Sequence, residues 1–382
     1  MRHLITALAT IFVALVPAAA LARLAPRPVG SLLDGFEMYG YLSAGAGWQR
    51  FSDASVTEWT NDGSFAGVLG SVIPNVQSGV VPEPKQDDAM AFVEMAELGI
   101  AKSFGDRASL RTDIWLGRPG SGSWVPFGIE IEQAYATVTL SRKHDIEFWL
   151  GRFVTEAGFE EDSPYDNDSI SWSILARSNL YPYYATGAQM IFGLWEGGRL
   201  YIGTSNSVIN DWDLKANDMP GFYATLSVEW GDEEKGSWLT ITPFYGPESG
   251  SNRHASYGVN SAGGIWVTPE LQIGYDAVYH RDNGFGGPNT DYAAGLLNLH
   301  LDFTEETYGF ARYAYAHQFE DGNGVLNLTG AKQQIHEWSI GGGHLIAEGI
   351  KFKFEARADA VMPSGGATQW TPGAAIGMVC AF

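Results

Sequence analysis

Cysteine is almost absent from this 382-residue chain, which has only Cys380. A single cysteine excludes an internal disulfide and a thiolate metal cluster, so stability must come from other interactions. Long hydrophobic runs are missing as well, because no stretch of 18 or more apolar residues follows residue 22. A membrane-spanning helix needs about 20 such residues. If the chain enters a membrane, it must therefore do so as a closed β-barrel.

Basic residues are few, with 23 Lys and Arg against 44 Asp and Glu and a formal net charge of −21. Nucleic acid is an unfavourable partner for a chain of this charge. Strong acidity is also typical of disordered chains, but 45% hydrophobic and 13% aromatic residues are too many for that class. We therefore expect a folded protein that does not bind nucleic acid.

The first 22 residues have the features of a secretory signal peptide. A short basic start precedes an apolar run over residues 4–16, and Ala20-Leu21-Ala22 has the A-x-A pattern of a cleavage site. Cleavage after Ala22 leaves a short N-terminal lead, residues 23–35, and a single domain, residues 36–382. The lead is too short to be the plug of an active transporter.

Apolar and polar residues alternate with a period of two through much of this domain. In residues 350–359 every second residue is apolar, and the alternate positions carry charge. The same alternation recurs in residues 110–116 and 271–280. A period of two is typical of a strand with one apolar face. These segments of about ten residues are longer than the strands of soluble sheets and match a tilted membrane strand.

The connections between the expected strands alternate strictly in length. The long polar links are residues 52–89, 118–127, 155–185, 210–220, 247–255, 282–289, 320–331 and 361–370. The tight turns lie near residues 105–107, 141–144, 196–199, 231–237, 269–270, 304–306 and 346–349. Outer-membrane barrels have short periplasmic turns, long external loops and even strand numbers. We predict an all-β, antiparallel transmembrane β-barrel of about 16 strands, within a range of about 14 to 18.

Aromatic residues suggest how the barrel sits in its membrane. Trp195, Trp230, Trp238 and Trp266 lie beside the short turns, where a periplasmic aromatic girdle is expected. The alternative is ordinary core packing of each ring. The last strand ends at Phe382 after alternating apolar residues, which resembles the signal read by the outer-membrane insertion machinery.

A barrel of this size leaves an aqueous channel, so charged residues on its inner face contact water. The predicted pore-lining residues are Arg111, Asp113, Lys351, Lys353, Glu355, Arg357 and Asp359. Further candidates with a less secure register are Glu97, Glu130, Glu132, Asp276 and Arg312. The alternative is that these charges pair with one another and brace the wall.

The link over residues 155–185 is the third long one, and in general porins the third external loop commonly folds into the pore. Its charged residues form a candidate constriction: Glu156, Glu160, Glu161, Asp162, Asp166, Asp168 and Arg177. An acidic ring of this kind favours cations over anions. The alternatives are a solvated external loop without selectivity and calcium binding by its aspartates, although no EF-hand-like spacing supports calcium.

The same stretch carries a family resemblance. Its matching residues are Gly151-Arg152-Phe153, Thr155, Gly158, Glu160, Arg177, Pro182 and Thr186-Gly187. This pattern resembles the putative β-barrel porin-2, or OmpL-like, family, although Ala157 stands where that pattern often has proline. The resemblance implies a porin and adds no catalytic residue.

We therefore expect a porin of the bacterial outer membrane that passes small hydrophilic solutes or ions passively, without cofactor or metal. Its expected partners are membrane lipid, the solutes, the insertion machinery and two further copies in a homotrimer. A cation preference is the finer hypothesis.

Two other classes of function stay open. The first is a docking or adhesion barrel that uses the long region 52–89. The second is an outer-membrane hydrolase, for which His254, His280 and His317 with Asp276, Asp282 and Asp321 are the candidates. No nucleophile motif accompanies these histidines.

Overall fold

The computed structural model describes residues 35–50, 87–116, 129–161, 163–177, 180–208, 219–231, 235–247, 255–283, 289–320, 332–364 and 368–382. The predicted signal peptide and nearly all of the N-terminal lead lie outside these residues. Within the described part of the chain, no helix is long and apolar enough to span a membrane.

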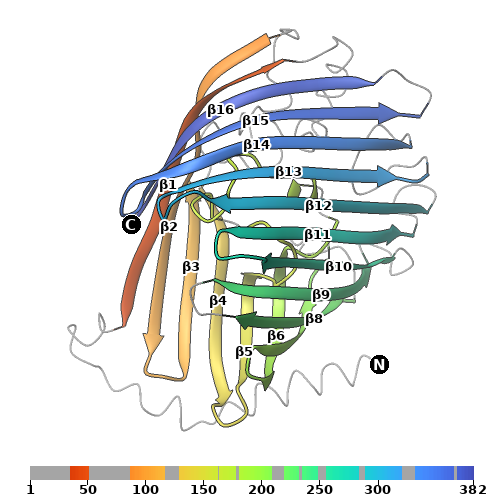
Figure 1. Cartoon of the computed structure of the whole chain (residues 1–382). Helices are drawn as coiled ribbons and strands as arrows, with labels where there is room; N and C mark the ends of the chain where they lie inside the picture. Colours follow the sequence, from red (N-terminus) through yellow and green to blue (C-terminus); the bar gives the residue numbers. More distant parts are fainter. Residues whose placement is uncertain are drawn as a thin grey trace.

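Sixteen antiparallel strands close into a single barrel, as Figure 1 shows. Their bounds are β1 (Phe36–Arg50), β2 (Asp87–Phe104), β3 (Ala108–Leu116), β4 (Ile129–Ser141), β5 (Ile146–Val154), β6 (Tyr184–Trp195), β7 (Gly198–Ser205), β8 (Gly221–Gly231), β9 (Gly236–Pro247), β10 (Ala255–Trp266), β11 (Leu271–Asp282), β12 (Thr290–Asp302), β13 (Thr307–Gln318), β14 (Gln333–Ala347), β15 (Ile350–Pro363) and β16 (Gln369–Ala381). The described residues also include one short helix, α6 (Ile174–Arg177). The predicted fold class and strand number are confirmed.

Strand order follows chain order, and closure comes from pairing of β1 with β16. At the end of this seam the Phe382 amide donates to the Gly40 carbonyl at 3.0 Å, and the Gly40 amide donates back at 3.1 Å. Met378 is 47% exposed. The terminal strand therefore completes the barrel while it presents apolar side chains outward.

Each predicted short turn joins two neighbouring strands, from β2–β3 to β14–β15. The last long link is shorter than predicted, because β15 continues to Pro363 and β16 begins at Gln369. The Val361–Gln369 pair extends the pairing of β15 with β16 into a region that the sequence predicts to be a loop.

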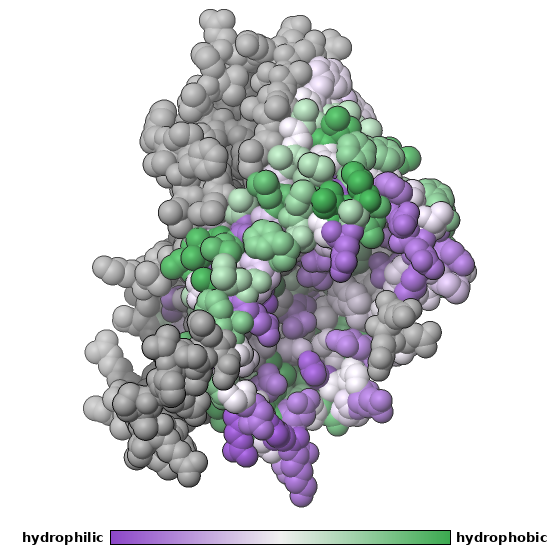
Figure 2. Space-filling view, turned by 90° about the vertical axis from the view of Figure 1, so that its left-hand side faces the viewer, coloured by the Kyte–Doolittle hydropathy of each residue, from purple (hydrophilic) through white to green (hydrophobic). Residues whose placement is uncertain are grey.

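The two faces of β15 show how the sequence alternation maps onto the barrel. Phe352 and Phe354 are 36% and 51% exposed, whereas Lys353 and Glu355 are 1% and 2% exposed. Charge therefore faces the interior, and apolar side chains face outward. Figure 2 shows hydrophobic residues gathered in a band across one side of the molecule, with hydrophilic residues at its lower and right-hand margins.

The predicted tryptophan girdle is only partly correct. Trp195 and Trp230 are 56% and 46% exposed. Trp238 instead stacks on Phe159 with ring centroids 6.1 Å apart, and the Trp266 ring lies 5.8 Å from that of His300. The prediction is wrong for these two tryptophans, because their positions in β9 and β10 share the inward face of those strands.

Candidate functional site: the loop inside the barrel

The segment between β5 and β6, residues 155–183, is called the inserted loop, and its described residues 155–161, 163–177 and 180–183 lie within the barrel (Figure 1). Figure 1 draws it in yellow-green, inside the strands. Its Gly158 amide donates to the Asn260 side chain on β10 at 3.1 Å. Further along the loop, the Ile174 amide donates to Glu337 on β14 at 2.9 Å. The inserted loop is therefore attached to the inner wall of the second half of the barrel.

Two glycines allow the chain to enter and begin this loop. Gly151 has φ +134°, and a Cβ there would lie 2.2 Å from the carbonyl oxygen of Ala134. Gly158 has φ +102°, and its Cβ would lie 2.5 Å from the Tyr181 hydroxyl. Both positions combine a backbone conformation that L-residues rarely adopt with a close approach of other atoms. Their steric limits explain why glycine stands in this part of the motif.

The other motif residues hold the base of the loop. Phe153 is fully buried in an apolar cluster. The Arg152 guanidinium lies 4.7 Å above the Tyr184 ring. The Thr155 hydroxyl donates to the Pro182 carbonyl across the two arms of the loop. Arg152, Phe153 and Thr155 of the family motif therefore lie at the base of the inserted loop.

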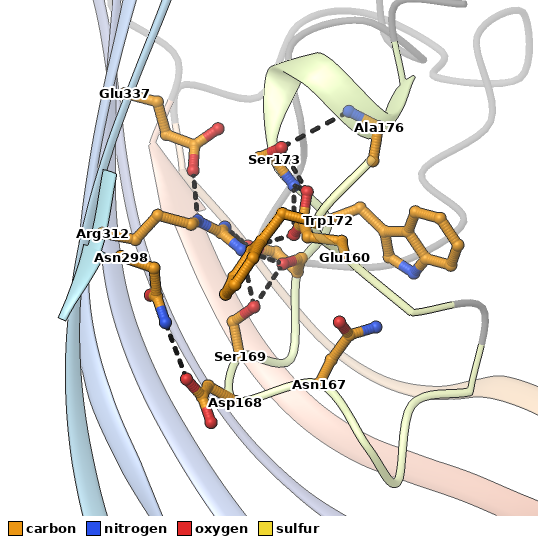
Figure 3. Close-up of polar contacts among 12 residues, drawn as sticks. Glu160, Asn167, Asp168, Ser169, Trp172, Ser173, Ala176, Asn298, Arg312 and Glu337 are labelled. Atoms are coloured by element: carbon orange, nitrogen blue, oxygen red, sulfur yellow. Dashed lines mark hydrogen bonds and ion pairs between the residues drawn. The ribbon is translucent and has the colours of Figure 1, made fainter. Parts of the chain in front are cut away.

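Arg312 on β13 is the central cation of the contact between loop and wall (Figure 3). Its Nη1 lies 2.8 Å from Oε1 of the loop residue Glu160, and its Nε lies 2.8 Å from Oε1 of Glu337. Its Nη2 lies 3.6 Å from Oε1 of Glu355. The arginine side chain is only 2% exposed. Loop and wall thus share a buried guanidinium.

A second arginine extends this network along β15. Arg357 contacts Glu337 through Nη2 at 2.9 Å and Asp359 through Nε at 2.9 Å. Its Nη1 also donates to the loop carbonyl of Trp172 at 2.7 Å. Because Glu337 contacts both arginines, the charges form one connected group rather than separate pairs.

Backbone amides of the loop complete the coordination of these carboxylates. The Ile170 and Ser171 amides donate to Oε2 of Glu355 at 2.9 and 2.7 Å. The Ser173 amide donates to Glu160 at 3.0 Å, and the Ser173 hydroxyl also contacts this carboxylate. Burial raises the pKa of Glu160, while the Arg312 guanidinium acts in the opposite direction. Hydrogen bonds and ion pairs together offset much of the cost of burying these charges.

A second polar contact holds Asp168 of the loop. Its Oδ1 lies 2.7 Å from Nδ1 of His300, and its Oδ2 accepts a hydrogen bond from Asn298 at 2.8 Å. Nε2 of His300 lies 2.9 Å from Asp302, which pairs with Lys235 at 2.7 Å. Asp168 of the predicted constriction therefore anchors the loop to β12.

The two predicted lysines also bind the loop, through its carbonyl groups. Lys351 Nζ donates to the Tyr165 carbonyl at 2.6 Å. Lys353 Nζ donates to the carbonyls of Pro164 and Asn167. Both cations therefore attach the loop to β15 through its backbone carbonyl groups.

Apolar packing supports the loop on the side of α6. Ile174, Leu175 and Leu180 are at most 1% exposed and belong to a buried cluster. That cluster includes Leu296 and Ile335 on the inner wall of the barrel. The loop is therefore held by packing in addition to its polar contacts.

The remaining predicted wall residues lie elsewhere on the inner face. On β3, Arg111 Nε contacts Oδ2 of Asp113 at 2.8 Å, and the Tyr39 hydroxyl donates to the same aspartate. Glu97 accepts a hydrogen bond from Trp115 at 2.9 Å. The predicted residues thus form two groups, one on β2 and β3 and the other around the inserted loop.

The loop acids differ from one another. Glu161 and Asp166 are exposed, whereas Glu156 is half-buried and burial raises its pKa. Asp162 and the side chain of Arg177 lie outside the described residues, as does the side chain of Glu130.

Glu337 is absent from the sequence predictions, although it contacts both arginines. Residues 333–339 carry polar side chains on both faces of the strand, so the alternation there does not indicate which face is inward. The serines that contact the carboxylates give no sequence signal either, because their role depends on the path of the loop.

Comparisons with known proteins agree with this architecture. The model of the family described as putative beta-barrel porin-2, OmpL-like, matches residues 121–378, which is more than half of the chain. No curated protein sequence matches the chain.

Solved structures with a similar fold are outer-membrane proteins. The outer membrane channel DcaP of Acinetobacter baumannii has a TM-score of 0.61 at 12% identity, covering 91% of this chain and 97% of that one. An anion-selective porin from Comamonas acidovorans has a TM-score of 0.61 at 9% identity, covering 91% and 99%. The trimer form of OmpT from Vibrio cholerae has a TM-score of 0.56 at 12% identity, covering 91% and 99%. At these identities the likeness concerns the fold alone.

Proposed function

The chain belongs to the putative β-barrel porin-2, OmpL-like family, and from this premise we propose that it is a passive channel of the bacterial outer membrane for small hydrophilic solutes and ions. The observation that carries the proposal is a closed barrel with an apolar outer face, a charged inner face and a loop packed inside it. Such an interior replaces part of the hydration shell of a passing solute.

In this proposal the inserted loop narrows the channel. Arg111 and Asp113 lie on the inner face of β3, where the Arg111 side chain is 38% exposed and that of Asp113 is buried beside it, and the charged residues of β15 support the loop from the wall. The residues of β15 that support the loop are Lys351, Lys353, Glu355, Arg357 and Asp359. In this proposal some of the predicted residues line the pore, and others brace the wall and the loop.

A weak cation preference is the finer part of the proposal. The arginines Arg312 and Arg357 are outnumbered by the carboxylates that surround them, namely Glu160, Glu337, Glu355 and Asp359. Most of this charge is buried and paired, so its field in the channel is small. The exposed acids Glu161 and Asp166 are the groups that would act on passing ions.

Single-channel recording in a planar bilayer tests both parts. We expect discrete conductance steps and, across a salt gradient, a reversal potential displaced towards cation permeability. The double substitution E161Q/D166N should reduce that displacement while the conductance steps persist. Both side chains are exposed, so their substitution should change the stability of the barrel little. Anion preference in the wild-type chain would contradict the cation hypothesis, and correctly folded barrels without conductance would contradict the channel.

We also propose that the chain is not an enzyme. His280, a candidate of the enzymatic alternative, is fully buried with Nδ1 2.9 Å from the Leu180 carbonyl of the loop. Asp276 accepts hydrogen bonds from the Phe159 amide at 3.2 Å and from Asn260 at 2.6 Å. Contacts that attach the loop are a sufficient role for both residues. His254 and Asp321 lie outside the described residues.

A homotrimer is the proposed assembly. It rests on the fold shared with the trimer form of OmpT, and light scattering of the purified protein in detergent tests it. A monomeric mass would contradict it. The docking alternative was based on region 52–89, which lies outside the described residues except for the first residues of β2.

A further inference from the structure

The inner face of β1, β4 and β5 carries three half-buried aromatic rings. They belong to Tyr39, Tyr135 and Trp149. The Tyr135 and Trp149 rings are stacked, with centroids 4.9 Å apart and planes 15° apart. Leu150 and Val138 are 55% and 39% exposed on the outer face of the same strands. Because alternate residues point to opposite faces, the exposed parts of these rings face the interior.

The inserted loop and the start of β6 carry a second group of half-buried rings. Trp172 and Tyr183 meet edge to face at 6.0 Å, and Tyr183 and Tyr184 at 5.0 Å. The Trp172 carbonyl accepts a hydrogen bond from Arg357. Figure 3 shows its indole directed away from Arg312 and the wall that carries it. The indole therefore lies on the side of the loop that faces away from Arg312 (Figure 3).

The two groups of rings share a buried neighbour. Tyr135, Trp149 and Tyr183 all pack against the buried apolar cluster that contains Phe153. The first group lies on strands of the wall, and the second lies on the loop and its base. We call the six rings the aromatic track: Tyr39, Tyr135, Trp149, Trp172, Tyr183 and Tyr184.

Charged groups lie beside this track. Arg111, whose side chain is 38% exposed, lies 5.2 Å from the Tyr39 ring and is neutralised by Asp113 at 2.8 Å. The Tyr184 hydroxyl donates to Glu132, and Arg152 lies over the ring of this tyrosine. The Glu147 carboxylate accepts a hydrogen bond from the Trp149 indole at 3.2 Å. The track therefore offers apolar ring faces beside charged and neutral hydrogen-bonding groups.

This combination suits a solute with two kinds of surface. A pyranose ring has apolar C–H faces, which pack on aromatic rings, and hydroxyl groups around its edge, which hydrogen-bond to polar side chains. Aromatic surfaces with a few placed polar groups are typical of sites for such ligands. A simple ion makes little use of the ring faces. The track thus favours neutral, ring-shaped, hydroxylated solutes.

We propose that the aromatic track is a weak binding path for carbohydrates within the channel. This inference rests on the proposed channel function and specifies its solute class. Several rings in succession allow a sugar to move from one contact to the next, because each contact is weak. Binding that is weak and distributed over several sites is compatible with passage.

Interruption of the ion current by sugar tests the proposal on the full chain in a planar bilayer. Maltohexaose is the probe, and polyethylene glycol of similar mass is the control solute, because it has no ring faces. We expect maltohexaose to interrupt the current reversibly and at lower concentration than polyethylene glycol. Equal interruption by the two solutes in a conducting channel would overturn the carbohydrate inference and leave the channel function intact. A folded barrel without conductance would overturn both.

Substitutions separate the track from general effects on the barrel. W149L and W172L should each weaken the interruption by maltohexaose about threefold to tenfold, as expected for the loss of one aromatic contact. W149F should restore most of the effect. W338L removes an outward tryptophan that is 39% exposed and should change nothing. Unchanged interruption in both W149L and W172L would overturn the proposal, and either variant suffices if the other fails to fold.

Discussion

At the scale of single residues, Arg312 has the largest influence on the barrel interior. It contacts a carboxylate of the inserted loop and carboxylates of two wall strands, and its side chain is 2% exposed. Water does not reach these groups, so each depends on its partners for solvation. The loss of one partner is therefore more costly than the net stability of the whole network suggests.

We expect R312L to leave Glu160 and Glu337 without their shared cation. Removing one partner of a buried ion pair typically costs about 3–5 kcal/mol. Part of that cost is avoided if the loop detaches, so R312L should make residues 155–183 more sensitive to added protease while the barrel persists. Limited proteolysis with mass spectrometry checks this. R111L removes the cation of the Arg111–Asp113 pair within β3, so it is the matched control and should not expose the loop.

Gly151 gives a second prediction at the residue scale. G151A would place a Cβ 2.2 Å from the Ala134 carbonyl oxygen at a φ of +134°, so it should lower the resistance of the folded barrel to urea. G295A is the control, because a Cβ there would lie 3.6 Å from the Asp276 carbonyl oxygen, an ordinary contact. Equal urea midpoints for both variants would show that the chain around Gly151 adjusts without cost.

At the scale of elements, the inserted loop and the wall are built separately. β5 and β6 pair directly from Ile146–Phe192 to Val154–Tyr184, so the wall next to the loop is complete without it. The loop adds hydrogen bonds to β10 and β14 and apolar packing through α6. The wall therefore sets the diameter of the barrel, and we propose that the loop sets the width of the open channel inside it.

Replacing residues 159–180 by a short Gly-Ser linker tests this separation. We expect a barrel that still folds and conducts, with a larger single-channel conductance, because the group of side chains that fills one side of the interior is removed. A spectrum of β-structure by circular dichroism serves as the folding control. An unchanged conductance would mean that the loop does not limit the current.

At the scale of the whole molecule, the outer surface is organised by depth in the membrane. Phe354 lies within β15 and is 51% exposed, whereas Phe303 lies in a short turn and is 63% exposed. Charged substitutions on the lipid face of barrels typically cost about 2–4 kcal/mol near the midplane and about 0–1 near the interfaces. The two side chains are both well exposed, so exposure does not predict different costs for a charged substitution. Their different depths in the membrane do.

F354R should therefore impair folding into lipid vesicles far more than F303R does. The fraction folded at a fixed urea concentration, read from Trp fluorescence, gives the comparison. Similar losses for the two variants would contradict the placement of the short turns at a membrane interface.

The sequence by itself determined the wall of this protein. Alternation in β15 placed Lys353 and Glu355 inward and Phe354 outward, because a strand gives each residue only two directions. The lengths of the connections predicted the strand number, since each short turn forces an antiparallel neighbour. These signals are local, and they can be read without knowing the rest of the fold.

Only the tertiary structure decided what the interior contains. That Glu160 meets Arg312 across 152 positions of the chain depends on the path of a loop without regular structure, which no periodicity encodes. The same applies to Glu337, and to Trp238, which faces inward to stack on a loop residue. Long-range contacts inside a closed barrel are set by packing and by pairing of buried charges, and these depend on all the strands together.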